Sequence, residues 1–184
     1  MNEDNVVGLV LDRLDALGVE YMVVGSYASN LYGRPRSSFD ADLVVRVPGE
    51  KVEPFVRAFL PDFAVEPDGL RRDLESGSAF NLIPYDALFK IDIVPLRRTP
   101  FAEEEFRRRR QVRALDRAIW IASPEDVILS KLHWYRRGGE VSGRQVEDAR
   151  DVYAVQKDVL DDGYMNRWAD ELGVRDLMDR IRAG

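Results

Sequence analysis

The sequence contains no cysteine and only one histidine, His133. Without cysteine the chain has no disulfide and no thiolate metal site, and it suits a reducing compartment. A single histidine argues against a histidine-rich metal centre and against a Ser-His-Asp triad. Any catalytic metal would therefore be bound mainly by carboxylate oxygen, which favours magnesium, manganese or calcium.

Long apolar runs are also absent, so no segment is expected to span a membrane. The N-terminus, Met-Asn-Glu-Asp-Asn, is acidic and does not resemble a signal peptide. The sequence therefore predicts a cytoplasmic protein without a membrane partner. Its net charge of −6 argues against a large sequence-independent DNA-binding surface, although a local basic patch could still bind a nucleotide or RNA.

With 184 residues, 45% of them hydrophobic, the chain can form one core with a small appended subdomain. Apolar periodicity predicts the order of the elements. Strands are expected over residues 21–24, 39–47, 79–83 and 87–94, with one or two more over 112–121. Helices are expected over 6–17, 27–32, 51–60, 101–110, 123–134, 144–156, 162–172 and 175–181, and a weak hairpin over 63–79. This pattern predicts an α+β fold, with a mixed sheet and helices over residues 1–121 and a helical subdomain over 122–184.

The strand that begins at Phe39 carries two carboxylates, Asp40 and Asp42. Because side chains alternate along a strand, these two lie on one face, opposite an apolar face. Like charges on one face are unfavourable unless a cation lies between them, and magnesium prefers such oxygen ligands. An exposed acidic edge strand is the alternative interpretation of this motif alone.

Two further features favour the metal-site interpretation. Gly25-Ser26 stands at an expected strand-to-helix junction, where glycine permits close approach of a ligand and free N–H groups can bind phosphate. Taken alone, this dipeptide is usually only a turn with a cap. The later strand contains Asp92 between Ile91 and Ile93. If the two aspartate-bearing strands are neighbours, three carboxylates converge near one helix N-terminus.

Together these motifs resemble the DNA polymerase β-type nucleotidyltransferase superfamily. The similarity rests on Gly25-Ser26, on the run Arg36-Ser37-Ser38-Phe39-Asp40-Ala41-Asp42 and on the later Asp92. Within the superfamily the chain is most similar to the AbiEii-like nucleotidyltransferases, which include toxins of type IV toxin–antitoxin systems. Ser123–Leu132 resembles their third motif, and Arg144–Asp148 resembles their fourth motif, with Glu-Asp in place of the usual Lys-Asp.

The resemblance implies a nucleotidyltransferase fold and assigns roles to particular residues. Asp40, Asp42 and Asp92 would hold Mg²⁺ or Mn²⁺, and Asp92 would also help to deprotonate the acceptor hydroxyl. Lys131 would balance phosphate charge and would be oriented by Asp148. The residues expected to bind the nucleotide are Gly25, Ser26, Arg36, Ser38 and Lys131. Arg34 and Arg36 have a second interpretation, a solvated turn.

The implied reaction is transfer of a nucleoside monophosphate from NTP to an acceptor hydroxyl, with release of pyrophosphate. The resemblance makes an RNA, especially a tRNA 3′ end, one candidate acceptor and a cognate antitoxin protein a candidate partner. A small molecule or a protein hydroxyl is the alternative acceptor. A different class of hypothesis is a nucleotide-binding toxin–antitoxin module without catalytic turnover.

Overall fold

The structure is a computed structural model that describes residues 2–183. The chain forms two compact units. The first comprises the chain up to Val23 together with Ser38–Ile121, and the second comprises Val24–Ser37 together with the chain from Ala122 onward. The sequence had suggested a simple division after residue 121, with all preceding residues in the core. Residues 24–37 instead group with the C-terminal helices.

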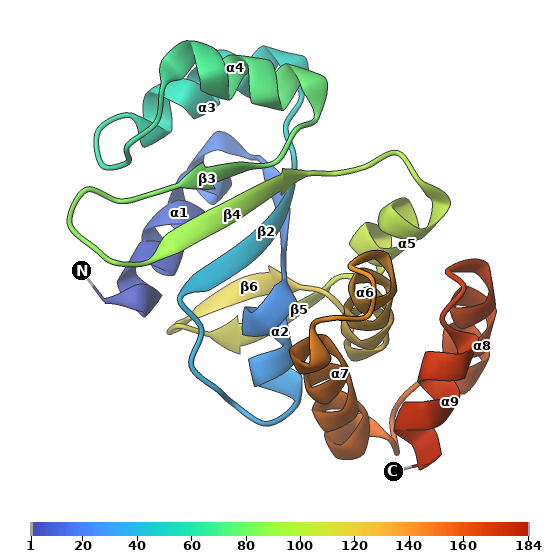
Figure 1. The fold of residues 1–184 in the computed structure, drawn as a ribbon. Helices are drawn as coiled ribbons and strands as arrows, with labels where there is room; N and C mark the ends of the chain where they lie inside the picture. The colour runs from blue at the N-terminus through green and yellow to red at the C-terminus, as the bar shows by residue number, and fades with distance from the viewer. Residues whose placement is uncertain (1, 184) are drawn as a thin grey trace. The chain divides into compact units, whose positions relative to one another are not determined.

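A six-stranded mixed sheet forms the centre of the first unit (Figure 1). Its strand order is β3-β4-β2-β1-β6-β5. The strands are β1 (Glu20–Val24), β2 (Asp40–Arg46), β3 (Phe80–Leu82), β4 (Lys90–Pro95), β5 (Arg110–Ala114) and β6 (Arg117–Ile121). β2 pairs with β4 and β1 with β6 in parallel, whereas β3 and β5 pair antiparallel with β4 and β6. The expected α+β class and mixed sheet are confirmed.

Helices of the first unit supply much of its apolar core. They are α1 (Glu3–Leu17), the short 3₁₀ helix η1 (Gly49–Lys51), α3 (Val52–Phe59), α4 (Pro67–Ser76) and α5 (Pro100–Arg108). Leu11 and Leu14 of α1 are fully buried. Phe55 and Phe59 of α3 are also buried, with ring centroids 4.6 Å apart. This apolar packing gives the sheet a fixed support.

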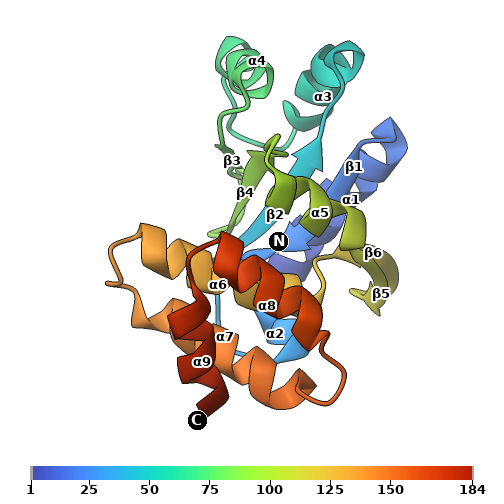
Figure 2. The same cartoon turned by 90° about the vertical axis from the view of Figure 1, so that its right-hand side faces the viewer.

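The segment 63–79 does not form the hairpin expected from its sequence. It contains α4, which lies beside α3 (Figures 1 and 2), and only a single bridge pairs Phe63 with Pro84. Glu66 caps the helix by accepting hydrogen bonds from the first-turn amides, Pro67 occupies its first turn, and Gly77 ends it at φ 73°. These start and stop signals outweigh the high content of turn-forming residues.

The second unit, as far as the structure describes it, is built from five helices. They are α2 (Gly25–Tyr32), α6 (Pro124–Arg137), α7 (Gly143–Gln156), α8 (Asp162–Glu171) and α9 (Arg175–Ala183). α2 packs against α6 and α7, which explains why it groups with this unit. At the end of α2, a Cβ added to Gly33 would come within 2.9 Å of the backbone nitrogen of Val152 on α7. Glycine therefore permits this close approach.

The start of α6 is fixed by its sequence and by a buried contact with α8. Ser123 caps the helix and Pro124 occupies its first turn, as expected. The Ser123 hydroxyl donates to Asp126 Oδ2 at 2.7 Å, and the Tyr164 hydroxyl donates to Oδ1 at 2.5 Å. These bonds fix α8 against α6. None of the described helices is both long and apolar enough to cross a bilayer.

Candidate active site

Three carboxylates lie on one face of two neighbouring strands in the first unit. Ala41, Leu43 and Val45 are fully buried on the other face of β2, which leaves Asp40 and Asp42 on the more open side. The same alternation in β4 buries its isoleucines and places Asp92 on that open side. The parallel register sets Asp42 directly opposite Asp92. We refer to Asp40, Asp42 and Asp92 together as the carboxylate face.

Lys90 lies on the same face, which sequence reasoning had missed. Its Nζ donates to both Asp92 oxygens, at 2.6 and 2.5 Å, and lies 4.0 Å from Asp40 Oδ2. The hydrogen bond to Asp92, and the nearby charges of Asp40 and Asp42, outweigh burial and raise the pKa of Lys90 above 10.5. Lys90 therefore stays an ammonium at neutral pH. The signal was present in the sequence, because residues 90 and 92 of one strand share a face.

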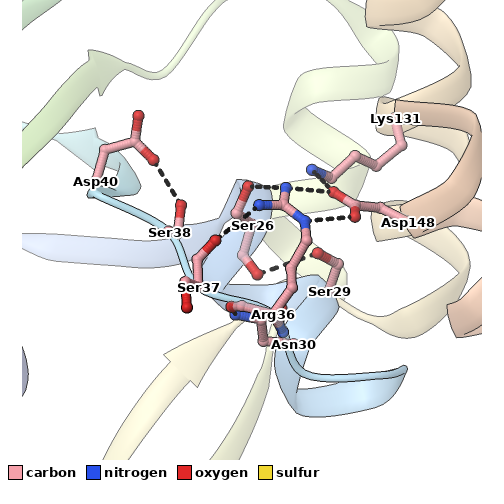
Figure 3. A network of polar contacts seen from close by, with 9 residues as sticks. All are labelled: Ser26, Ser29, Asn30, Arg36, Ser37, Ser38, Asp40, Lys131 and Asp148. Carbon is pink, nitrogen blue, oxygen red and sulfur yellow. Dashed lines mark hydrogen bonds and ion pairs between the residues drawn. The ribbon is translucent and has the colours of Figure 1, made fainter. Parts of the chain in front are cut away.

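Ser38 precedes β2 and contacts the carboxylate face directly. Its hydroxyl donates to Asp40 Oδ1 at 2.8 Å (Figure 3). This contact orients the Asp40 carboxylate, and the assignment of Ser38 to nucleotide binding stays a prediction. A hydroxyl donor on one oxygen leaves the other oxygen of Asp40 available to a cation.

The second unit holds a separate polar cluster, made of Ser26, Arg36, Lys131 and Asp148, which we call the Asp148 network. The Arg36 guanidinium lies between Ser26 and Asp148 (Figure 3). It donates to both Asp148 oxygens at 2.8 Å and to Ser26 Oγ at 2.8 Å. Lys131 Nζ donates to Asp148 Oδ2 at 2.7 Å. The contact between Lys131 and Asp148 agrees with the sequence prediction, whereas the bidentate Arg36 contact was not foreseen.

Burial and neighbouring charges shift the pKa of Asp148 in opposite directions. The side chains of Asp148 and Lys131 are only 8% and 6% exposed. Burial alone would raise the pKa of Asp148, but the hydrogen bonds from Arg36 and Lys131 outweigh it and hold the pKa below its usual value of 3.8. One carboxylate is thus shared by two cations, so the network carries an excess of positive charge suited to an anion.

The loop after α2 fixes the position of Arg36. Asn30 Nδ2 donates to the Arg36 carbonyl at 2.7 Å, and the Arg36 amide donates to Asn30 Oδ1 at 3.1 Å. Arg36 is therefore not part of a solvated turn, which was one of its two interpretations. Arg34 does fit that interpretation, because its side chain is 78% exposed and approaches Asp151 only to 3.7 Å.

Gly25 provides the turn from β1 into α2. Its φ of 63° lies in the left-handed region, which a residue with a side chain rarely adopts. No side chain caps the N-terminus of α2. The first-turn amides, beginning at Gly25 and Ser26, can therefore donate to an anion, as the sequence predicted for this junction.

The residues of the carboxylate face suit a divalent cation in chemical type. Carboxylate oxygens are the ligands that Mg²⁺ and Mn²⁺ prefer, and a cation would relieve the repulsion between Asp42 and Asp92. Within residues 2–183, no three His, Asp or Glu side chains are already arranged to hold a metal ion. Both oxygens of Asp92 instead accept hydrogen bonds from Lys90.

Comparison with solved structures decides the fold. An antigenic nucleotidyltransferase-like protein from Paracoccidioides brasiliensis is similar over 98% of this chain and 92% of its own, with a TM-score of 0.60 and 19% identity. This chain has a nucleotidyltransferase fold. The antibiotic-resistance factor ANT(2'')-Ia is similar over 98% of this chain and 94% of its own, with a TM-score of 0.59 and 13% identity. The lincosamide antibiotic adenylyltransferase LnuA covers 84% of this chain, and the match spans 98% of LnuA, with a TM-score of 0.56 and 13% identity.

No known family profile and no curated protein sequence matches the chain. The nucleotidyltransferase fold extends over nearly all of it, including the second unit. The part of the resemblance that concerns fold is thereby confirmed. Its narrower part, similarity to the AbiEii-like group, stays a prediction.

Proposed function

We propose that the protein transfers a nucleoside monophosphate from NTP to an acceptor hydroxyl and releases pyrophosphate. The observation that carries this proposal is the carboxylate face, three carboxylates on adjacent parallel strands of a nucleotidyltransferase fold. A like-charged set of this kind costs stability unless it binds a cation, so it is best explained by function.

Asp40 and Asp42 would hold Mg²⁺ or Mn²⁺, with Ser38 keeping the Asp40 carboxylate in one orientation. The metal would supply positive charge to the triphosphate oxygens during an in-line displacement. Asp92 would complete the ligand set and accept the proton of the acceptor hydroxyl. That role requires the Asp92 oxygens to be free of Lys90.

In this proposal, residues of the second unit bind the phosphates. Arg36, Lys131 and the uncapped amides of α2 are all hydrogen-bond donors to anions, and the two side chains share only one carboxylate. Asp148 would hold Arg36 and Lys131 in fixed positions rather than contact the nucleotide. Ser26 Oγ accepts from Arg36 and would donate its own proton to a phosphate oxygen.

The acceptor candidates are RNA, a small molecule and a protein hydroxyl. The resemblance to AbiEii-like proteins favours RNA, such as a tRNA 3′ end, together with a toxin role and a cognate antitoxin partner. Two of the similar structures belong to proteins that act on antibiotics, one of them determined as a complex with adenylyl-2''-tobramycin. They favour the hydroxyl of a small molecule as the second candidate.

Transfer from NTPs labelled at the α-phosphate tests the proposal. Each NTP is incubated in turn with magnesium, the protein, and total RNA, total protein or a panel of small polyhydroxyl compounds. Label entering one class of acceptor supports the proposal and names the acceptor. Magnesium-dependent NTP binding without transfer to any class would favour the non-catalytic binding module, and no NTP binding at all would refute the proposal.

A further inference from the structure

The ammonium of Lys90 binds the Asp92 oxygens that a metal on the carboxylate face would also use as ligands. We propose that Lys90 is an internal counter-ion: it holds Asp92 in the metal-free protein, gives it up when a divalent cation binds, and thereby sets metal affinity. Lys90 is in this sense a positioning residue for Asp92. The inference rests on the proposed function, because it takes the carboxylate face as the metal site.

The geometry makes the ammonium and a divalent ion competitors. Lys90 Nζ donates to both Asp92 oxygens at 2.6 and 2.5 Å, so no oxygen of Asp92 lacks a cationic neighbour. Mg²⁺ needs its ligand oxygens at about 2.0–2.1 Å and tolerates little distortion. An ammonium that binds both oxygens and a divalent ion that binds one of them compete for the same carboxylate, and the two cations repel each other.

The position of Lys90 also allows it to leave. Its side chain is 40% exposed and belongs to the open face of β4, whereas Ile91 and Ile93 are fully buried on the other face. A lysine ammonium on a flexible stem can move into water without any change in the backbone. The strand therefore stays in place while the cation is exchanged.

Removing the ammonium leaves the carboxylates to repel one another. Lys90 faces Asp40 in the register of β2 and β4, just as Asp42 faces Asp92. The charged groups that the two paired strands present on this face are these three carboxylates, Lys90 and, at the far end of β2, Arg46, which pairs with Glu20 and Glu103. In the absence of Lys90, a divalent ion would meet stronger negative charge and no competitor. Metal affinity is therefore expected to rise when the lysine is neutralised.

Mn²⁺ binding followed by electron paramagnetic resonance tests this without measuring activity, since bound Mn²⁺ loses the signal of the free ion. The neutral variants Lys90→Met and Lys90→Gln are each expected to bind Mn²⁺ about three- to tenfold more tightly than the wild type, as for loss of one partly exposed ion pair. Lys90→Arg keeps the charge and is expected to restore the wild-type affinity. Lys157→Met removes the same charge from an exposed position on the second unit and serves as the matched control.

The outcomes separate the inference from the proposed function. Unchanged or weaker Mn²⁺ binding by both neutral Lys90 variants would overturn the inference, because Lys90 would then be a permanent ion-pair partner. An equal gain in Lys157→Met would also overturn it, since the effect would follow net charge alone. Asp42→Asn tests the site itself. If it binds Mn²⁺ as tightly as the wild type, or if no variant binds Mn²⁺, the metal site fails, and the inference fails with it.

Discussion

Asp42 and Asp92 lie directly opposite each other in the parallel register of β2 and β4. Two carboxylates in this position repel each other, and apolar or oppositely charged pairs would stabilise the sheet better. The fold nevertheless keeps them on one open face and places Lys90 beside them. A local arrangement that lowers stability within an otherwise consistent fold is typical of functional sites.

Replacing Asp42 by Asn should reduce nucleotidyl transfer by at least about a hundredfold, because it removes a charged metal ligand while preserving shape. Initial rates with labelled NTP measure the effect. Asp116→Asn is the matched control: Asp116 is exposed at the β5–β6 turn, with φ 56°, a conformation that Asn tolerates well. Transfer by Asp42→Asn at the rate of the control would contradict the assignment.

The pairing of Lys90 with Asp92 should appear as a small coupling free energy in the metal-free protein. Both side chains are partly exposed, at 40% and 25%, so solvent screens the pair. A double-mutant cycle with Lys90→Met and Asp92→Asn, measured by urea unfolding in EDTA, should give at most about 1 kcal/mol. The coupling should fall when magnesium is added. A coupling that magnesium does not change would show that the ion pair persists with metal present.

Alternation of apolar residues was enough to predict which face of each strand carries its carboxylates. The periods in β2 and β4 put Asp40, Asp42 and Asp92 opposite buried side chains, and the structure places the two strands next to each other. Adjacency itself could not be derived, because the chain between the two strands contains η1, α3, α4 and β3. The same period also places Lys90 on that face, two residues before Asp92, so the sequence did contain a signal for their contact.

Longer-range features were less accessible from the sequence. Arg36 and Asp148 are 112 residues apart, and no local pattern indicates that they pair. Residues 24–37 group with the C-terminal helices because α2 packs on α6 and α7, and such contacts are set by tertiary packing. The α4 region, by contrast, carries capping signals at Glu66, Pro67 and Gly77. Its content of turn-forming residues led to the prediction of a hairpin instead.

Tyr164→Phe should destabilise the second unit by about 1–3 kcal/mol, because it removes a hydrogen bond to a buried carboxylate. The Tyr164 hydroxyl donates to Asp126 Oδ1 at 2.5 Å, and Asp126 is fully buried. Urea unfolding measures the change. Tyr153→Phe, at a partly exposed position on α7, is the control and should change stability by less than about 0.5 kcal/mol. Equal stabilities of the two variants would contradict this role of Tyr164.

Asp148→Asn should cost more stability than Lys131→Met. The first change removes the carboxylate that Arg36 and Lys131 both bind, whereas the second leaves Asp148 still bound to both donors of Arg36. Removing one partner of a buried ion pair costs about 3–5 kcal/mol. Because Arg36 is partly exposed, we expect the loss for Asp148→Asn to lie near the lower end of this range. Urea unfolding of the two variants gives the order, and the reverse order would show that Lys131 is the main partner.

Low pH should lower the stability of the second unit, because it protonates Asp148. Burial opposes ionisation of this carboxyl, but hydrogen bonds from Arg36 and Lys131 hold its pKa in the folded protein below 3.8. The folded state thus binds the proton less tightly than the unfolded chain, whose pKa is about 3.9. The resulting stability is fully present above that value and is lost as the pH falls through the lower folded pKa. Urea unfolding at a series of pH values below about 5 should therefore show a steeper loss for the wild type than for Asp148→Asn, which has no proton to gain there. Parallel curves for the two proteins would mean that other carboxylates account for the acid sensitivity.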